Sequence, residues 1–206
     1  SLHVVVSKEV TDAVPNSKYV GVDRGIKRIA VTSNNQFFGG SHVKQVTRRY
    51  KALKSKLQKA GTKSAKRHLR QISGKENRFR RDVNHCISKQ IVQNIEVGTT
   101  IILEDLKNIR RGSAKLRKEQ RAEVNRWNFF QLEQFLKYKA DGAGCFVDYV
   151  DARYTSQKCS KCGHISRSNR IDQSRFKCHV CGFQLNADLN ASRNISQNYQ
   201  DSIGYP

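Results

Sequence analysis

Four cysteines near the carboxyl end of the chain have the spacing of a metal site. They form two C-x-x-C pairs separated by 15 residues: Cys159, Cys162, Cys178 and Cys181. Four thiolates at this spacing are typical of tetrahedral zinc, and a site closed by four sulfurs has no open position for a substrate. We therefore predict one structural Zn²⁺. A redox dithiol or a pair of disulfides is the competing interpretation, although a redox centre needs only one such pair.

Three acidic residues, far apart in the chain, lie at the ends of predicted elements. Asp23 and Glu104 each end an apolar strand, and Asp188 begins the last predicted helix. The carboxyl ends of strands in an open α/β sheet face ligands, and Mg²⁺ prefers carboxylate oxygens. Two such ions would suit phosphodiester hydrolysis. For each acid alone, a structural role is the simpler interpretation.

Glu104 is followed directly by a second acid, Asp105. Successive residues of a strand point to opposite faces of a sheet, so only one of the two side chains should enter a shared site. The residues alone leave both candidates open.

The charge of the chain indicates a polyanionic partner. Its 206 residues include 39 Lys and Arg against 17 Asp and Glu, a formal net charge of +22. A nucleic acid is the expected partner and an anionic membrane surface the lesser alternative. No apolar run reaches the length of about 18 residues that a membrane span needs, and no secretory signal is present, so we expect a reducing, cytoplasmic setting. The sequence has no methionine, even at position 1, which suggests that the natural chain begins upstream.

The elements that must position these residues follow from the apolar pattern. Short apolar runs predict strands at residues 2–6, 19–23, 28–33, 36–38, 99–103 and 146–150, and residues 187–195 read as a final helix. The Asn34-Asn35 pair favours a tight hairpin between the third and fourth of these strands. We expect an α/β fold with a mixed sheet.

Residues 41–90 form a basic segment. They contain 16 Lys and Arg against Glu76 and Asp82, a net charge of +14. Apolar residues recur at steps of three and four on both sides of a break near Gly61 and Gly74, which predicts two long amphipathic helices. Such a one-sided charge favours contact with phosphates, whereas a solvated helix face is the plainer alternative.

A further helix follows a charged loop or irregular helix at residues 112–126. Aromatic residues at Trp127, Phe130, Phe135 and Tyr138 mark this helix, and Gly142 and Gly144 signal its end. The two cysteines outside the cluster, Cys86 and Cys145, are expected to be buried as small apolar residues.

Several motifs together resemble one known family. They are G-V-D-R-G (21–25), I-L-E-D-L (102–106), W-N-F-F-Q-L-E-Q-F-L-K-Y-K-A (127–140), Y-T-S-Q-K-C-S-K-C-G (154–163) and F-K-C-H-V-C-G-F-Q-L-N-A-D-L-N-A-S-R-N-I (176–195). They resemble the C-terminal half of TnpB, the transposon-encoded RNA-guided nuclease family related to compact type V CRISPR effectors. The resemblance implies an RNase H-like (RuvC) fold with helices on both faces of its sheet.

The resemblance also implies roles for individual residues. Asp23, Glu104 and Asp188 would be the catalytic triad that binds Mg²⁺ or Mn²⁺, which favours Glu104 over Asp105. Cys159, Cys162, Cys178 and Cys181 would hold zinc, and Arg153 and Gln157 would contact phosphate or substrate.

The resemblance implies boundaries as well. Residues 1–15 would be the tail strand of an upstream barrel, 16–152 the RuvC-like core with a basic helical insert at 41–97, 153–185 the zinc ribbon, and 186–206 the last RuvC helix and tail.

The resulting hypothesis is a Mg²⁺-dependent DNA endonuclease domain. Its partners would be DNA and, in the full-length protein, a guide RNA, because in RNA-guided nucleases base pairing supplies the sequence specificity. Two alternatives remain: a nuclease-silent RNA-guided DNA-binding protein and a transposase that joins DNA strands.

Overall fold

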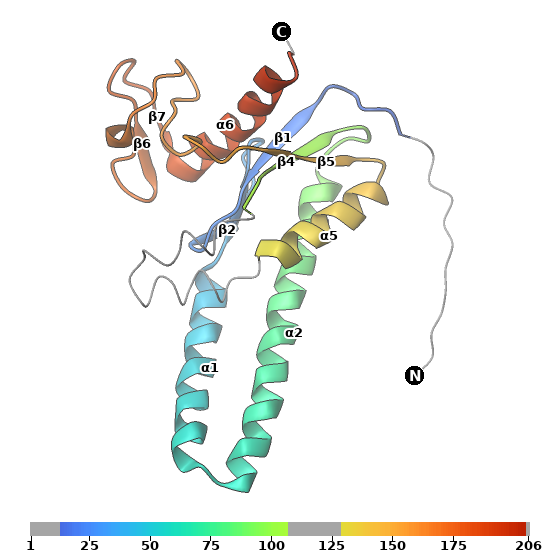
Figure 1. Ribbon diagram of the computed structural model, residues 1–206, viewed down its shortest axis with the longest axis vertical. Helices are drawn as coiled ribbons and strands as arrows, with labels where there is room; N and C mark the ends of the chain where they lie inside the picture. The colour runs from blue at the N-terminus through green and yellow to red at the C-terminus, as the bar shows by residue number, and fades with distance from the viewer. Residues whose placement is uncertain (1–12, 107–128, 205–206) are drawn as a thin grey trace.

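The computed structural model describes residues 13–106 and 129–204, which form a mixed α/β fold (Figure 1). Within these ranges a five-stranded sheet has the order β3-β2-β1-β4-β5. Strands β1, β2 and β3 pair antiparallel, whereas β1, β4 and β5 pair parallel. The strands are β1 (Tyr19–Asp23), β2 (Arg28–Thr32), β3 (Phe37–Gly39), β4 (Thr100–Glu104) and β5 (Phe146–Val150). The prediction of a mixed sheet is confirmed.

Helices cover both faces of the sheet, because side chains alternate along each strand. Val22 packs in a core with Ile91 of helix α2 (Lys63–Gln93) and Leu132 of helix α5 (Phe129–Asp141). The neighbouring Gly21 faces helix α6 (Ala187–Ser202). Strand β4, which lies between β1 and β5, is buried along its whole length. Asp23 and Glu104 therefore share the α6 face of the sheet with Gly21.

The basic segment is a long helical hairpin of α1 (Ser41–Ala60) and α2 that projects from the sheet (Figure 1). Gly61 ends α1 in a left-handed conformation with a φ of 66°, and the Thr62 side chain caps α2 by accepting from the Ala65 N–H at 3.1 Å. Glu76 on α2 is buried between Lys54 of α1 and Arg80. This ion-paired carboxylate joins the two helices.

Two expectations about this hairpin need correction. The break predicted at Gly74 is absent, and this residue lies inside α2. An internal glycine costs a helix only about 1 kcal/mol relative to alanine, which a long helix packed against a partner tolerates. Cys86 lies exposed on α2, whereas Cys145 is buried as expected. The apolar periodicity did identify the side of α2 that meets the core, which includes Ile87 and Ile91. Cys86 lies off that side, so its residue type alone did not predict its burial.

The cysteine-bearing segment forms a small lobe beside the start of α6 (Figure 1). It contains a short 3₁₀ helix η2 (Arg167–Asn169) and a two-stranded sheet of β6 (Arg175–Lys177) and β7 (Gln184–Asn186). Its core consists of Phe176, Cys159, Cys178 and Ala187, with Phe183 against them. Helix α6 continues beyond its predicted end at Ile195 to Ser202.

Some predictions fall outside the described residues. These are the opening strand at 2–6, the charged segment at 112–126 and the aromatic residue Trp127. Among the residues that the structure covers, no helix combines the length and apolar composition that a membrane span requires.

Candidate functional site

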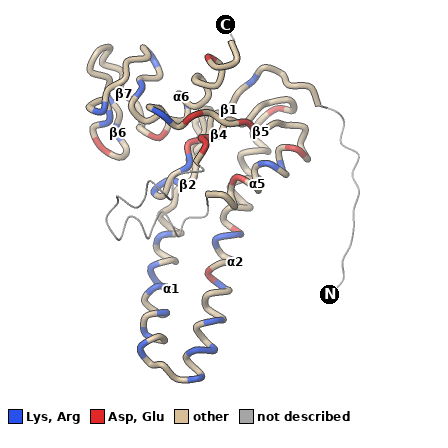
Figure 2. The backbone as a smooth tube through the Cα atoms, in the orientation of Figure 1, with Lys and Arg blue, Asp and Glu red and all other residues tan. Residues whose placement is uncertain are grey.

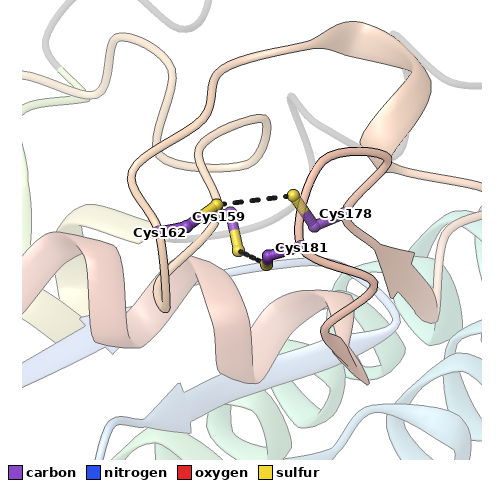
Figure 3. A group of neighbouring side chains, drawn as sticks. All are labelled: Cys159, Cys162, Cys178 and Cys181. Atoms are coloured by element: carbon purple, nitrogen blue, oxygen red, sulfur yellow. Dashed lines mark hydrogen bonds between the residues drawn. The ribbon is translucent and has the colours of Figure 1, made fainter.

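The four predicted zinc ligands converge (Figure 3). Their sulfur atoms all lie within 4.8 Å of one another, with Cys159 to Cys181 at 3.7 Å and Cys162 to Cys178 at 3.6 Å. Tetrahedral Zn–S bonds of about 2.3 Å would place sulfurs about 3.8 Å apart, so these residues fit zinc.

Two tight turns create this spacing. The N–H of Gly163 donates to the Cys159 carbonyl at 2.9 Å, and the N–H of Gly182 donates to the Cys178 carbonyl at 3.1 Å. Both glycines have positive φ, 76° and 68°, as the C-G pairs predicted. Each turn therefore directs the sulfur atoms of its two cysteines toward the same cluster.

The first two acids are neighbours in the sheet. Val22 of β1 is paired with Leu103 of β4 in parallel register, so the next residues, Asp23 and Glu104, end adjacent strands. Burial raises the pKa of Asp23 to about 8, and the nearby carboxyl groups of Glu104 and Asp188 act in the same direction. Burial also raises the pKa of Glu104, opposed by a hydrogen bond from Thr155 and by the Arg24 charge. A cation among these carboxyl groups would relieve their repulsion.

Asp105 belongs to the other side of the sheet. It is exposed and lines a hollow of about 410 Å³ with Tyr149, Val150 and Asp151. Burial and the Glu133 carboxylate raise the pKa of Tyr149, and the Asp105 charge acts in the same direction. The Tyr149 hydroxyl donates to Glu133 on α5 at 2.7 Å. Alternation along the strand thus separates Glu104 from Asp105.

The third acid lies in the first turn of α6 and contacts two arginines. Arg170, from the cysteine lobe, is 3.2 Å from Asp188 Oδ1, and Arg28 of β2 is 3.5 Å from Oδ2. Asn186 caps the helix by accepting from the N–H groups of Asp188 and Leu189 at 3.1 and 3.2 Å. Two guanidinium groups therefore compensate this carboxylate.

The three acids interact electrostatically but are not packed as closely as the cysteines. In the part of the chain that the structure describes, the four cysteines are the only group of three or more His, Cys, Asp or Glu whose ligand atoms all lie within 4.8 Å. The donor set nevertheless fits Mg²⁺, since it offers the carboxylate oxygens of buried Glu104 and of half-buried Asp23 and Asp188. Mg²⁺ also accepts water and substrate phosphate as ligands.

A buried arginine lies behind the site. The side chain of Arg24 has no exposed area; it donates to Glu133 at 3.0 Å and to the Glu104 carbonyl at 2.6 Å. Through these two hydrogen bonds, Arg24 connects helix α5 to the end of β4. The sequence offered one signal for Arg24, its place directly after Asp23.

Sequence reasoning missed the residues that contact the acids from elsewhere in the fold. Thr155 donates to Glu104 Oε1 at 2.6 Å, and Arg170 contacts Asp188. Thr155 belongs to the same R-Y-T-S-Q motif as the predicted Arg153 and Gln157. Arg153 is exposed and 3.5 Å from Asp151, and the backbone carbonyl of Gln157 accepts from Asn169 Nδ2 at 3.1 Å; their contacts with phosphate stay a prediction.

Comparisons with known proteins agree with these features. The family described as "Probable transposase", OrfB/IS605, matches residues 3–110, and the "Cas12f1-like, TNB domain" matches residues 129–195. The chain belongs to the OrfB/IS605 (TnpB) family. The resemblance to TnpB is thereby confirmed.

Relatives of this TnpB-family chain carry nuclease or TnpB-like names. It is 42% identical over 130 residues to the CRISPR-associated endodeoxyribonuclease Cas12f1 of Sulfoacidibacillus thermotolerans. This match covers 62% of this chain and 29% of the relative. It is 29% identical to the putative RNA-guided DNA endonuclease InsQ of Escherichia coli (94% of this chain, 52% of InsQ). It is 35% identical to the TnpB-like protein MJ0751 of Methanocaldococcus jannaschii (65% and 48%). The chain thus spans about half the length of InsQ and MJ0751.

The fold also has a solved counterpart. A cryo-EM structure of a Cas12f1–sgRNA–target DNA complex matches with a TM-score of 0.71 at 22% sequence identity, over 94% of this chain and 52% of the other. At this identity the likeness concerns the fold.

Proposed function

We propose that this TnpB-family chain is the RuvC-like nuclease domain, with its zinc ribbon, of an RNA-guided DNA endonuclease. Its substrate would be DNA, and in the full-length protein a guide RNA would select the target. The names of its relatives support this substrate class. We take residues 16–152 and 186–206 as the nuclease core and 153–185 as the ribbon.

One observation carries the proposal: Asp23 is half-buried at the end of β1 beside Glu104 at the end of β4, and desolvation together with the Glu104 and Asp188 carboxyl groups raises the pKa of Asp23 to about 8. Strongly shifted acids in a common site are typical of catalytic centres. Mg²⁺ bound by such carboxylates activates water and stabilises charge in phosphodiester hydrolysis. Asp23 must lose its proton to act as a ligand, which a metal-binding equilibrium would favour.

The surrounding cations suit a phosphate substrate. Arg170 and Arg28 flank Asp188, and Arg28 also stacks over the Phe37 ring at 4.9 Å. We propose that these two guanidinium groups, with the exposed Arg153, orient the DNA backbone near the acids. The basic hairpin of α1 and α2 would add attraction for nucleic acid along its length.

The decisive experiment replaces each acid with alanine in the full-length gene product. With guide RNA and Mg²⁺, we expect Asp23→Ala, Glu104→Ala and Asp188→Ala to reduce plasmid cleavage at least about 1,000-fold, because removal of a catalytic ligand removes most of the acceleration. Zinc content and guide RNA binding should stay as in the wild type, and Asp105→Ala is the matched control that should still cut.

Three outcomes would contradict the proposal. Normal cleavage by Asp188→Ala would exclude the triad. A wild-type protein that binds its target but never nicks it would be the nuclease-silent binder. Joined DNA ends, in place of hydrolysed ones, would indicate a transposase.

A further inference from the structure

The segment that enters the cysteine lobe, residues 155–160, lies against a buried polar face of α6, and we call it the ribbon stem. Asn190 and Asn194, one helical turn apart, are both fully buried. Asn190 donates to the Lys158 carbonyl at 2.8 Å and accepts from the Ser160 N–H at 3.1 Å. Asn194 donates to the carbonyls of Thr155 and Lys158 at 2.8 and 2.6 Å. Four hydrogen bonds thus hold the stem at fixed places on α6.

The stem begins with the residue that contacts Glu104. Thr155 is 3% exposed, and its hydroxyl is 2.6 Å from Glu104 Oε1. The same hydroxyl is 3.1 Å from the Ala152 carbonyl. Because one hydroxyl donates a single hydrogen, the shorter contact with the carboxylate takes it. This bond restricts the rotation of the Glu104 carboxyl group.

The stem is also tied to the predicted zinc. Cys159, inside the stem, is 1% exposed, and its sulfur belongs to the four-cysteine cluster. Thr155 is therefore held from both directions, by the Asn194 side chain and by the cysteine lobe that follows it. Thr155 can therefore orient the Glu104 carboxyl group without contacting a substrate itself.

We propose that Thr155 is a positioning residue for Glu104 and that Asn194 fixes Thr155 in its turn. The inference rests on the proposed function, since it assumes that Glu104 binds a divalent cation. Groups that orient a metal ligand in this way are typically worth a factor of about 10 to 100 in metal affinity. The effect should therefore appear in metal binding itself, before any DNA is cut.

The test measures Mn²⁺ binding to the zinc-loaded 206-residue chain by titration calorimetry and by electron paramagnetic resonance. Thr155→Val keeps the shape and removes the hydroxyl, so it should raise the Mn²⁺ dissociation constant about 10-fold or more. Thr155→Ser, which restores the hydroxyl, should return it to within about threefold of the wild type. The Mn²⁺ dissociation constant of Asn194→Leu should lie between those of Thr155→Val and Thr155→Ser.

A matched control separates positioning from stability. Ser192→Ala removes another buried side-chain hydrogen bond of α6, from the Ser192 hydroxyl to the Leu189 carbonyl at 2.9 Å, without touching the stem. It should lower the melting temperature and leave Mn²⁺ affinity unchanged. If Thr155→Val alters zinc content or melting, Thr155→Ala carries the same prediction without a methyl group against Glu104.

The outcomes are distinguishable. Wild-type affinity in folded Thr155→Val and Thr155→Ala would overturn the inference and leave the proposed function intact, provided that Asp23→Asn abolishes binding. If the wild type binds no Mn²⁺ or Asp23→Asn binds it equally well, the three-acid site fails and the inference falls with it.

Discussion

At the scale of residues, the site combines buried acids with arginines that compensate them in part. The Arg170 and Arg24 charges lower the pKa of Asp23, but burial and the Glu104 and Asp188 carboxyl groups outweigh them. Such a cluster of acids is electrostatically unfavourable in the absence of a compensating cation. Replacing Asp23 by a neutral residue should therefore change stability by an amount that depends on pH.

We predict that Asp23→Asn stabilises the zinc-loaded chain in the absence of Mg²⁺, and more at about pH 8 than at about pH 6. The native pKa of Asp23, about 8, lies above its unfolded value of 3.8. Between these values the native state retains a proton that the unfolded chain loses, so wild-type stability falls as the pH rises. Asparagine does not titrate and removes this fall.

Thermal unfolding followed by circular dichroism at the two pH values checks this prediction. The exposed acid Asp151 provides the control, and Asp151→Asn should keep the wild-type pH dependence. An Asp23→Asn protein with a wild-type pH dependence would mean that Asp23 is not the buried acid responsible.

At the scale of elements, the position of Asp188 depends on how closely α6 approaches β1. A Cβ atom on Gly21 would lie 2.1 Å from the Ser192 carbonyl oxygen and 2.7 Å from the Ser196 N. Both are backbone atoms of α6, so the helix must move to admit even one methyl group. The glycine of the G-V-D-R-G motif is thus required by packing, two residues before the first acid.

We predict that Gly21→Ala destabilises the chain by about 1–3 kcal/mol or more, as overpacking does in well-packed cores. It should also weaken Mn²⁺ binding, because the displaced α6 carries Asp188. Gly39→Ala is the matched control, since a Cβ atom there meets nothing within 4 Å. Urea unfolding and Mn²⁺ titration measure the two effects, and wild-type values for Gly21→Ala would show that α6 can shift freely.

At the scale of the whole molecule, much of the positive charge lies away from Asp23, Glu104 and Asp188. Figure 2 shows Lys and Arg along both helices of the hairpin and acids where the central strands end. Within a net charge of +22, residues 41–90 contribute +14. A projecting, strongly basic hairpin suits binding to the phosphate backbone, whereas a solvated surface would leave binding insensitive to its charge.

We predict that reversing three exposed hairpin charges, Lys51→Glu, Lys56→Glu and Lys66→Glu, weakens binding of a labelled DNA duplex. The slope of log K against log salt concentration should flatten by roughly 0.7–0.9 for each phosphate that the protein no longer neutralises. Arginine at the same three positions keeps the charge and should keep the slope. Fluorescence anisotropy over a range of salt concentrations makes the measurement, and an unchanged slope in the glutamate variant would return the hairpin to the solvated interpretation.

The sequence by itself determined the parts of this protein whose interactions are local. Two residues between paired cysteines, each pair followed by glycine, suffice to form the two cysteine turns, and apolar runs suffice to predict the strands of the five-stranded sheet, although not β6 and β7. The motif resemblance added the family and the preference for Glu104 over Asp105. These features depend on short-range geometry or on the residues themselves.

Only the tertiary structure decided which side chains surround the acids. Arg24 reaches the Glu104 carbonyl 80 residues away, Thr155 reaches its carboxyl group across 51 residues, and Arg170 meets Asp188 from the cysteine lobe. It likewise showed that Cys86 is exposed and that α2 continues through Gly74. Such contacts depend on strand order and on how distant segments pack against one another, and no local pattern contains that information.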